Sequence, residues 1–247
     1  MDREKYFYEA FEGMKRLGPG SAASTRRAMD FFPPKSGIKI LDVGCGAGTH
    51  TLMLAERFPE ADITAIDTHA PHIDGLNREA DEKGISHRVR GKVMSMFEMS
   101  FDDETFDLIW AEGSIYIAGF VRGIRDWKRL LKKGGYIVCS EISWLKENPS
   151  EESKAFWNAG YADMNTITGK IEQIQREGYA FKGCFVCPVS DWTENYYDQI
   201  EENLRKMEAR YGADSPAVET VSGLRQEIRL YHSHPDDYSY VFYAMEK

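Results

Sequence analysis

Residues 40–51 carry the pattern that most directly indicates chemistry in this chain: Ile-Leu-Asp-Val-Gly-Cys-Gly-Ala-Gly-Thr-His-Thr. An apolar strand is predicted to lead into a turn in which Gly44, Gly46 and Gly48 occupy alternate positions. Because glycine lacks a Cβ atom, the backbone of such a turn can approach a bound ligand closely. A dinucleotide-binding turn has glycines at positions 1, 3 and 6, but the sixth position here is Thr49. The spacing therefore disfavours a pyrophosphate-binding turn.

Two carboxylates flank this turn. Asp42 ends the apolar run before it, and Asp67 ends the next apolar run, Ile-Thr-Ala-Ile-Asp. Asp67 follows the glycines by about 20 residues, where a carboxylate can accept hydrogen bonds from both hydroxyls of a ribose. The simpler alternative is that the glycines form an ordinary tight turn and that Asp67 caps a helix.

The combination Asp-x-Gly-x-Gly-x-Gly with a strand-ending Asp resembles the class I methyltransferases that depend on S-adenosylmethionine (SAM). The resemblance implies a Rossmann-like methyltransferase fold, with the loop packed against the methionine portion and the ribose of SAM. It implies these SAM-binding residues in the loop and after the next strand: Asp42, Gly44, Cys45, Gly46, Thr49, Asp67 and Thr68.

The resemblance also implies an adenine site after the third strand. Ser95 stands where the family often has an acidic residue, and its hydroxyl can still accept a hydrogen bond, but without a charge. Met96 and Phe97 would hold adenine through backbone and apolar contacts. The alternative is that both side chains belong to the ordinary core.

The candidate catalytic residues follow the fourth strand. Methyl transfer mainly requires alignment of the reacting atoms and exclusion of water, and a base is needed only if the nucleophile carries a proton. Glu112 is the candidate for a carboxylate near the sulfonium or the acceptor; alternatively, it is structural and bonded to loop amides. Tyr116 could wall an acceptor pocket, as could Trp144 after the fifth strand, because ligands bind at the carboxyl ends of open parallel sheets. Packing in the aromatic core is an equal alternative for both rings.

Composition limits the partners of the chain. The formal net charge of −9 over 247 residues argues against a nucleic-acid substrate, because phosphate-backbone binding requires a basic surface. One basic run exists, and its charges interleave with apolar residues at helical spacing, which predicts a solvated helix face: Arg122, Arg125, Lys128, Arg129, Lys132 and Lys133. No apolar stretch approaches the roughly 20 residues that span a bilayer. The N-terminus has no apolar signal core, so we expect a cytoplasmic protein.

The cysteines and histidines do not form a metal-binding pattern. Cys184 and Cys187 make a CxxC with no second pair for zinc and no helix start for redox work. On a strand these two side chains would point to opposite faces. His232 and His234 fit a loop before the last strand. We therefore expect no metal site and no disulfide framework, and the lack of clustered thiols disfavours arsenite as the methyl acceptor.

Alternating apolar strands and helical patterns predict a doubly wound, mostly parallel α/β sheet. The expected strands are 38–43, 63–67, 89–94, 106–110, 136–142, 178–188 and 238–245. The expected helices are about 6–14, 22–32, 51–58, 71–83, 120–131, 151–164, 169–177, 191–211 and 216–231. The resemblance implies a seven-stranded sheet in which the seventh strand inserts antiparallel between the fifth and the sixth.

We expect one domain over residues 1–247. Its expected parts are an N-terminal helical cap at 1–34, a SAM-binding core at 35–147, and a C-terminal part at 148–247 with a helical insertion at about 190–234. The N-terminal and C-terminal additions resemble those of a bacterial subgroup that acts on small molecules. Both additions are rich in aromatic residues and are predicted to form a lid over SAM and acceptor or, alternatively, a homodimer interface: Tyr6, Phe7, Tyr8, Phe11, Trp192, Tyr196 and Tyr197.

Three classes of function remain open. The leading prediction is a SAM-dependent methyltransferase that acts on a small molecule. A non-catalytic SAM-binding sensor or scaffold is the second, because methyl transfer has no obligatory catalytic residue to look for. A nicotinamide-dependent oxidoreductase is the third; its glycine spacing is absent, and no Tyr-x-x-x-Lys pair follows a serine in the middle of the chain.

Overall fold

A mixed sheet organises the fold in the computed structural model, which describes residues 2–14, 16–161, 163–212 and 216–247. Within these residues the sheet has seven strands in the order β3-β2-β1-β4-β5-β7-β6. The strands are β1 (Lys39–Val43), β2 (Asp62–Asp67), β3 (Val89–Val93), β4 (Phe106–Ala111), β5 (Leu131–Trp144), β6 (Ala180–Val186) and β7 (Tyr238–Glu246). The first five run parallel, and β7 pairs antiparallel with both β5 and β6. The predicted insertion of the last strand between the fifth and sixth is confirmed.

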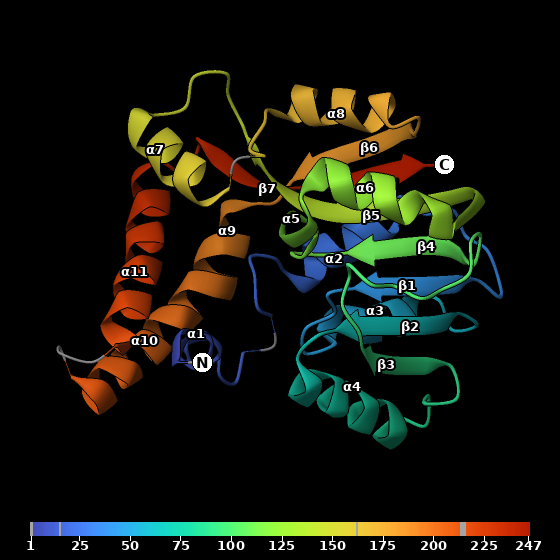
Figure 1. The fold of residues 1–247 in the computed structure, drawn as a ribbon, viewed down its shortest axis with the longest axis horizontal. Coiled ribbons are helices and arrows are strands. Elements are labelled where there is room, and N and C mark those ends of the chain that lie inside the picture. Colours follow the sequence, from blue (N-terminus) through green and yellow to red (C-terminus); the bar gives the residue numbers. More distant parts are fainter. Residues whose placement is uncertain (1, 15, 162, 213–215) are drawn as a thin grey trace.

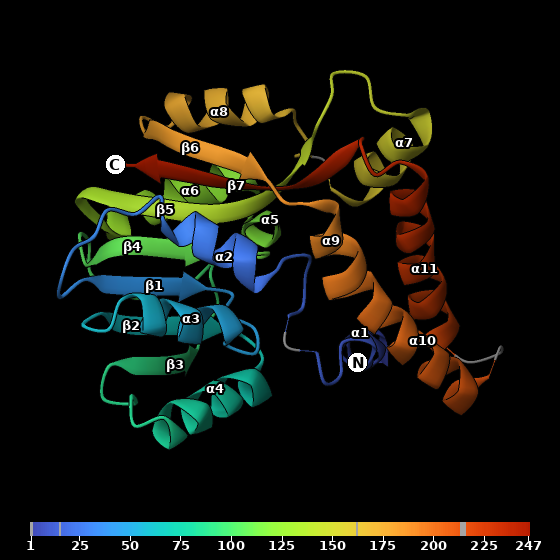
Figure 2. The ribbon, with the colours of Figure 1, turned by 180° about the vertical axis from the view of Figure 1, so that it is seen from behind.

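Helices cover both faces of the sheet (Figures 1 and 2). On one face pack α2 (Ala22–Met29), α3 (Thr49–Arg57) and α4 (Ala70–Glu82). On the other pack α6 (Phe120–Trp127) and α8 (Ile167–Arg176). The central strands are therefore buried on both faces: every residue of β4 is buried. This is expected for a parallel sheet that is covered by helices on both faces, because its strands are continuous apolar runs and do not alternate between apolar and polar residues.

The order of the strands places a ligand site. The chain leaves β1 on one side toward β2 and returns to pair β1 with β4 on the other. Such a switch point opens a crevice at the carboxyl ends of the strands. The turns after β1, β2, β3 and β4 all end at this edge.

A second layer of helices lies beyond that edge (Figure 1). It contains α1 (Asp2–Ala10), α7 (Glu151–Gly160), α9 (Val189–Trp192), α10 (Asp198–Tyr211) and α11 (Ala217–Ser233). A wide π-turn, Thr193–Tyr197, joins α9 to α10.

The helices of the insertion pack through buried aromatic rings. Trp192 stacks on Tyr231 with ring centroids 4.7 Å apart, and the Trp192 Nε1–H donates to Ser239 Oγ on β7 at 2.9 Å. Trp192 and Tyr197 are both buried. These rings are therefore core that fixes the insertion to the sheet.

Several boundaries differ from the expectations for physical reasons. The strand expected at 136–142 spans Leu131–Trp144, because Leu131 already pairs with Phe106 of β4. The helix expected at 120–131 consequently ends at Trp127, followed by one tight turn at 128–130. The helix expected at 191–211 divides at the π-turn. The helix expected at 151–164 ends at Gly160, and the short α5 (Ile115–Ala118) was not predicted.

In the part of the chain that the structure describes, no helix is both long and apolar enough to cross a bilayer.

Candidate active site

The three glycines after β1 all have positive φ angles, of +71°, +52° and +84° for Gly44, Gly46 and Gly48. Such angles favour glycine, but the surroundings of the three differ. A Cβ on Gly48 would lie 2.6 Å from Leu76 of α4, and one on Gly44 would lie 2.5 Å from Ser114 Cβ. Among the described residues, a Cβ on Gly46 would meet only the Leu17 side chain, at 3.2 Å. Gly44 and Gly48 thus permit close packing within the protein, and Gly46 is the glycine that keeps space open.

Asp67 is tied to the glycine-rich loop. Its Oδ2 accepts a hydrogen bond from the backbone N–H of Gly46 at 2.9 Å, and its Oδ1 accepts one from His69 N–H at 2.9 Å. An ionised carboxylate has about four acceptor positions. The two backbone bonds fix the orientation of the Asp67 side chain and leave capacity for two hydroxyl donors.

Asp42 and Thr49 support the loop and do not line the cleft described below. Asp42 is buried and accepts a hydrogen bond from Thr51 Oγ1 at 2.6 Å. Burial, opposed by this hydrogen bond, raises the pKa of Asp42 to about 7. Thr49 begins α3 directly after Gly48. Both residues hold the base of the loop.

A cleft of about 310 Å³ opens in front of the loop. The predicted residues that line it come from the ends of four neighbouring strands: Gly44, Cys45, Gly46, Asp67, Thr68, Ser95, Met96, Phe97, Glu112 and Tyr116. The fold thus brings ten of the predicted residues, which lie in distant parts of the sequence, to one edge of the sheet.

The segment after β3 forms the far wall of this cleft. Ser95 Oγ accepts a hydrogen bond from Phe97 N–H at 3.2 Å, so the hydroxyl stabilises its own turn and keeps its proton available. Phe97 is half-exposed, and the Arg122 guanidinium lies 5.1 Å from its ring centroid. The alternative of ordinary core is therefore wrong for Phe97. Met96 is partly buried and also lines the cleft.

Within the part of the chain that the structure describes, the bonds of Glu112 go to side chains and none goes to a loop amide, which was the structural alternative. Its Oε1 pairs with Arg16 Nη1 at 2.6 Å and accepts a hydrogen bond from Thr25 Oγ1 at 2.8 Å. His50 Nε2 lies 3.4 Å from the same oxygen. Burial lowers the pKa of His50 to about 4 although Glu112 opposes the shift, so His50 is neutral at pH 7. Sequence reasoning missed Arg16 and His50, because the Arg16–Glu112 pair spans 96 positions.

The N-terminal segment covers the cleft. Phe7, Tyr8 and Leu17 line it, and the Tyr8 ring stacks on His69 with centroids 4.0 Å apart. The other side of α1 is held by α10, where Asn203 Nδ2 donates to the carbonyls of Ala10 and Glu12 at 3.0 Å. Helix α1 therefore bridges α10 and the loop after β2 at the edge of the cleft.

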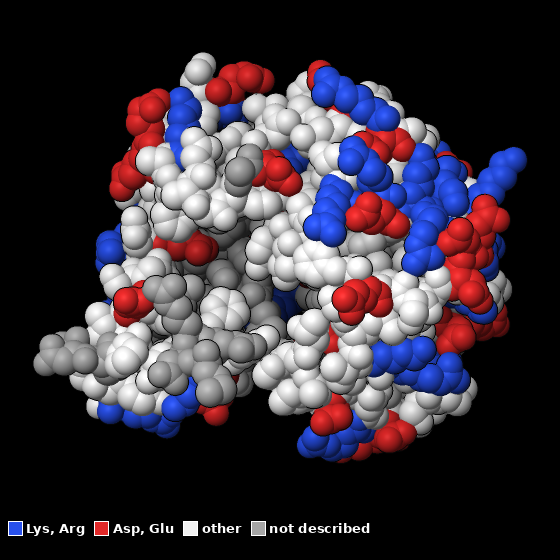
Figure 3. All heavy atoms as spheres, viewed as in Figure 1, with Lys and Arg blue, Asp and Glu red and all other residues white. Residues whose placement is uncertain are grey.

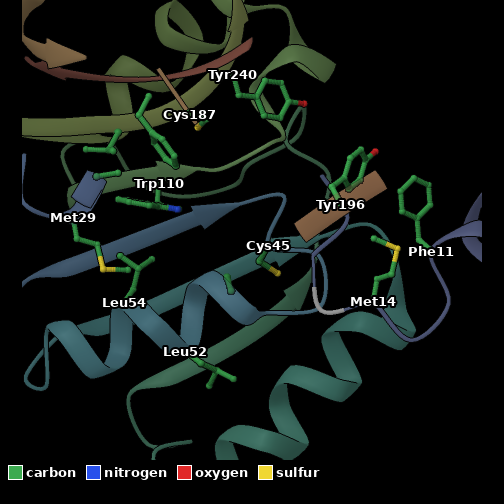
Figure 4. Close-up of a cluster of buried hydrophobic side chains, with 14 of the residues drawn as sticks. Phe11, Met14, Met29, Cys45, Leu52, Leu54, Trp110, Cys187, Tyr196 and Tyr240 are labelled. Atoms are coloured by element: carbon green, nitrogen blue, oxygen red, sulfur yellow. The ribbon is translucent and has the colours of Figure 1, made fainter. Parts of the chain in front are cut away.

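A second cavity, of about 750 Å³, adjoins the cleft; we call it the acceptor chamber. Figure 3 shows the molecule hollowed between the helices of the second layer and the sheet. The two cavities share Phe7, Gly113 and Tyr116 among their lining residues. In Figure 4, Phe11, Tyr196 and Tyr240, which also line the chamber, lie on one side of the core, away from Met29 and Leu54. Trp144 lines neither cavity.

Tyr116 lies where the cleft meets the chamber. Two-fifths of its surface is exposed, and its ring stands edge-to-face with Tyr161, with centroids 6.1 Å apart. Desolvation of the hydroxyl, with smaller contributions from Glu227 and Glu141, raises the pKa of Tyr116. Its hydroxyl is therefore a proton donor at neutral pH and not a base.

Comparison with known proteins agrees with this geometry. Residues 34–204 match the family described as "Methyltransferase domain". The chain belongs to this methyltransferase family.

Three relatives show what the chain resembles. It is 27% identical over 208 residues to a phosphoethanolamine N-methyltransferase of Triticum aestivum, covering 81% of this chain but 38% of that protein. A SAM-dependent methyltransferase from Geobacter sulfurreducens in complex with S-adenosylhomocysteine shares the fold with a TM-score of 0.83 at 19% identity, covering 98% and 97% of the two chains. The [4+2]-cyclase SpnF is 25% identical with a TM-score of 0.70, covering 90% of this chain and 80% of that one. The methyltransferase domain spans less than half the length of the wheat relative.

The cysteines of this methyltransferase domain are all free, and three of the four are buried. His234 pairs with Glu152 at 3.1 Å. Among the residues that the structure describes, no three His, Cys, Asp or Glu side chains gather in a way that could hold a metal ion.

Proposed function

We propose that this chain binds SAM in the cleft and transfers its methyl group to a small molecule in the acceptor chamber. The observation that carries the proposal is the continuity of the two cavities at Gly113 and Tyr116. One cavity is bordered by a glycine-rich loop and a strand-ending carboxylate. The other is large enough for a drug-sized molecule, since ligand pockets of roughly 300–1,000 Å³ are typical.

The residues of the cleft fit SAM. Asp67 has acceptor capacity for two ribose hydroxyls, and the space before Gly46 admits a ligand against the backbone. Met96 and Ser95 offer apolar and hydrogen-bonding contacts for a purine. When bound, SAM supplies a methyl group that its sulfonium already activates.

The protein would contribute position and shelter. The N-terminal segment, held over the cleft by Tyr8 and by the Arg16–Glu112 ion pair, excludes water from the reacting atoms. Because Arg16 neutralises it, Glu112 is a poor candidate for a general base. We propose that Glu112 is a positioning residue that closes the N-terminal segment, and that Tyr116 donates a hydrogen bond or provides a wall beside the acceptor.

A phosphorylated acceptor such as the one in the name of the wheat relative fits the chamber poorly. Among the residues that the structure describes, its lining includes Glu152 and Glu227 but no Lys, Arg or His. A phosphate group would need cationic or backbone donors in place of these carboxylates. We therefore infer a different small acceptor for this chain.

A second function is favoured by one observation. SpnF is at least as similar in sequence to this chain as the Geobacter structure and is named as a cyclase. A SAM-binding protein of this fold that does not transfer methyl groups is therefore the alternative. Labelled SAM separates the two, since only the methyltransferase moves the label.

We further propose a cytoplasmic protein, consistent with four free cysteines, that does not bind nucleic acid, consistent with its net charge of −9. Homodimerisation remains a prediction, which light scattering over a range of protein concentrations tests directly.

Calorimetric titration tests the cofactor assignment. We expect SAM and S-adenosylhomocysteine to bind in the micromolar range and NAD to show no heat of binding. NAD binding tighter than S-adenosylhomocysteine would overturn the assignment and favour the nicotinamide-dependent oxidoreductase instead.

A further inference from the structure

The acceptor chamber has aromatic walls from several elements. Phe11 and Tyr196 are near-parallel, with ring centroids 6.1 Å apart, and Phe156 stands edge-to-face with Trp157 at 5.2 Å. Tyr240 of β7 completes this side. Aromatic faces carry negative electrostatic potential and attract cations that lie over them.

Glu227 of α11 is the carboxylate inside this chamber. The other acidic lining residue, Glu152, has a side chain that is 72% exposed and paired with His234, so it lies at the rim. Tyr197, which is buried, donates its hydroxyl to Glu227 Oε1 at 3.0 Å. Within the described residues, no cationic side chain pairs with Glu227, and nothing bonds its Oε2.

The negative charge of Glu227 acts across the chamber. After desolvation, it is the main cause that raises the pKa of Tyr196, and it contributes to the raised pKa of Tyr116 at the junction with the cleft. Burial also raises the pKa of Glu227 itself. A cation placed among these groups would form an ion pair with the Glu227 carboxylate and would be attracted by the negative faces of the rings.

We propose that the acceptor is a small amine with an aryl or alkyl body, and that Glu227 determines specificity by binding its ammonium group. This inference deepens the proposed function, since it names the substrate class of the same chamber. The rings would enclose the apolar body and Glu227 Oε2 would accept a charge-assisted hydrogen bond from the cation. A neutral analogue gains only the apolar part, and an anionic one is repelled.

Three probes of similar size and different charge test the inference: 3-phenylpropylamine, 3-phenylpropan-1-ol and 3-phenylpropionate. Calorimetry on protein saturated with S-adenosylhomocysteine should show the amine binding at least ~10-fold more tightly than the alcohol, with the carboxylate weakest. Equal binding of amine and alcohol, tighter binding of the carboxylate, or no binding of the amine at millimolar concentration would overturn the proposal.

The variant Glu227→Gln assigns the preference to this side chain. The amide oxygen can still accept from Tyr197, so we expect the fold and the affinity for S-adenosylhomocysteine to be unchanged while the preference for the amine disappears. Glu152→Gln at the rim is the matched control and should keep the preference. An amine preference that survives Glu227→Gln would contradict the role of Glu227. Failure of S-adenosylhomocysteine to bind the unaltered protein would instead contradict the proposed function, and the probes can then be titrated alone.

Discussion

Asp67 binds the glycine-rich loop through one oxygen and the N–H of His69 through the other. We predict that Asp67→Ala lowers the affinity for S-adenosylhomocysteine roughly 10- to 100-fold. The reason is the loss of an acceptor for two hydroxyls, since hydrogen bonds to charged groups contribute about 1.5–3 kcal/mol each. Isothermal titration calorimetry provides the measurement.

Asp62→Ala is the matched control on the same strand. Asp62 is half-exposed and pairs with Arg90 at 3.2 Å, and such surface pairs contribute little to stability. Its affinity for S-adenosylhomocysteine should equal that of the unaltered protein. Unchanged affinity in a folded Asp67→Ala protein would remove Asp67 from the ribose site.

Gly46 is the loop glycine that keeps space open. We predict that Gly46→Val abolishes measurable binding of S-adenosylhomocysteine, because the side chain would occupy the cleft beneath Leu17. Gly37→Val introduces a side chain at a similar φ, +63°, with nothing within 4 Å of its Cβ. It therefore controls for backbone strain and should bind normally. Normal binding by Gly46→Val as well would place the ligand elsewhere.

The spacing of the glycines and of Asp67 in the sequence was sufficient to predict both Gly46 and Asp67, because the glycine-rich loop and the strand that ends in Asp67 are local patterns. Arg16, His50 and Glu227 could not be found in the same way. Arg16 and Glu112 are 96 positions apart in the sequence. Glu227 lies on α11, whose polar residues have the sequence pattern of an ordinary solvent-exposed face. Only the folded structure shows that Glu227 lines the chamber. Pairing across the fold is a tertiary property with no local signal.

Helix α1 is the element that links the insertion to the cofactor cleft. It contacts α10 through Asn203 and the loop after β2 through Tyr8. We predict that it opens for ligand exchange, since segments that cover binding sites belong to the less stable parts of a structure. Hydrogen exchange should then show increased protection of residues 2–14, together with the glycine-rich loop, when S-adenosylhomocysteine is added.

We expect the aromatic residues of the insertion to take no part in this movement. Trp192 and Tyr197 are buried against Tyr231 and β7, so their exchange should not change. If residues 2–14 are already protected without ligand and at every protein concentration, α1 is a static part of the core and the lid prediction is wrong.

The regular alternation of apolar strands with helical patterns made the strands of the sheet predictable from the sequence. The exact ends of the strands and helices depend on packing. The apolar runs at β1, β2 and β4 fall at the predicted positions because buried parallel strands read as such runs. The extension of β5 to Leu131 depends on pairing with Phe106. The π-turn at 193–197, in which Tyr196 and Tyr197 are buried, is not indicated by periodicity alone.

The stability of the whole molecule should depend on Asp42. Its pKa in the folded protein is about 7, above the ordinary 3.8, so ionisation of this carboxyl opposes folding. We predict that the free energy of unfolding, relative to that of Asp42→Asn, falls by on the order of 4 kcal/mol as pH rises from about 4 to 7. Above about pH 7 the difference should stay constant. Urea unfolding at several pH values measures this. A difference that does not vary with pH would mean that Asp42 titrates normally.

Transfer of the label from methyl-labelled SAM tests the central claim most directly. The protein is incubated with labelled SAM and a pool of small amines, alcohols and carboxylic acids, and the label is then separated by mass. The account predicts that the label moves to a small product in step with the formation of S-adenosylhomocysteine, and that Asp67→Ala slows the transfer at low SAM concentration. Label that stays in SAM, although SAM is shown to bind, would contradict methyl transfer and leave a SAM-binding protein of another function.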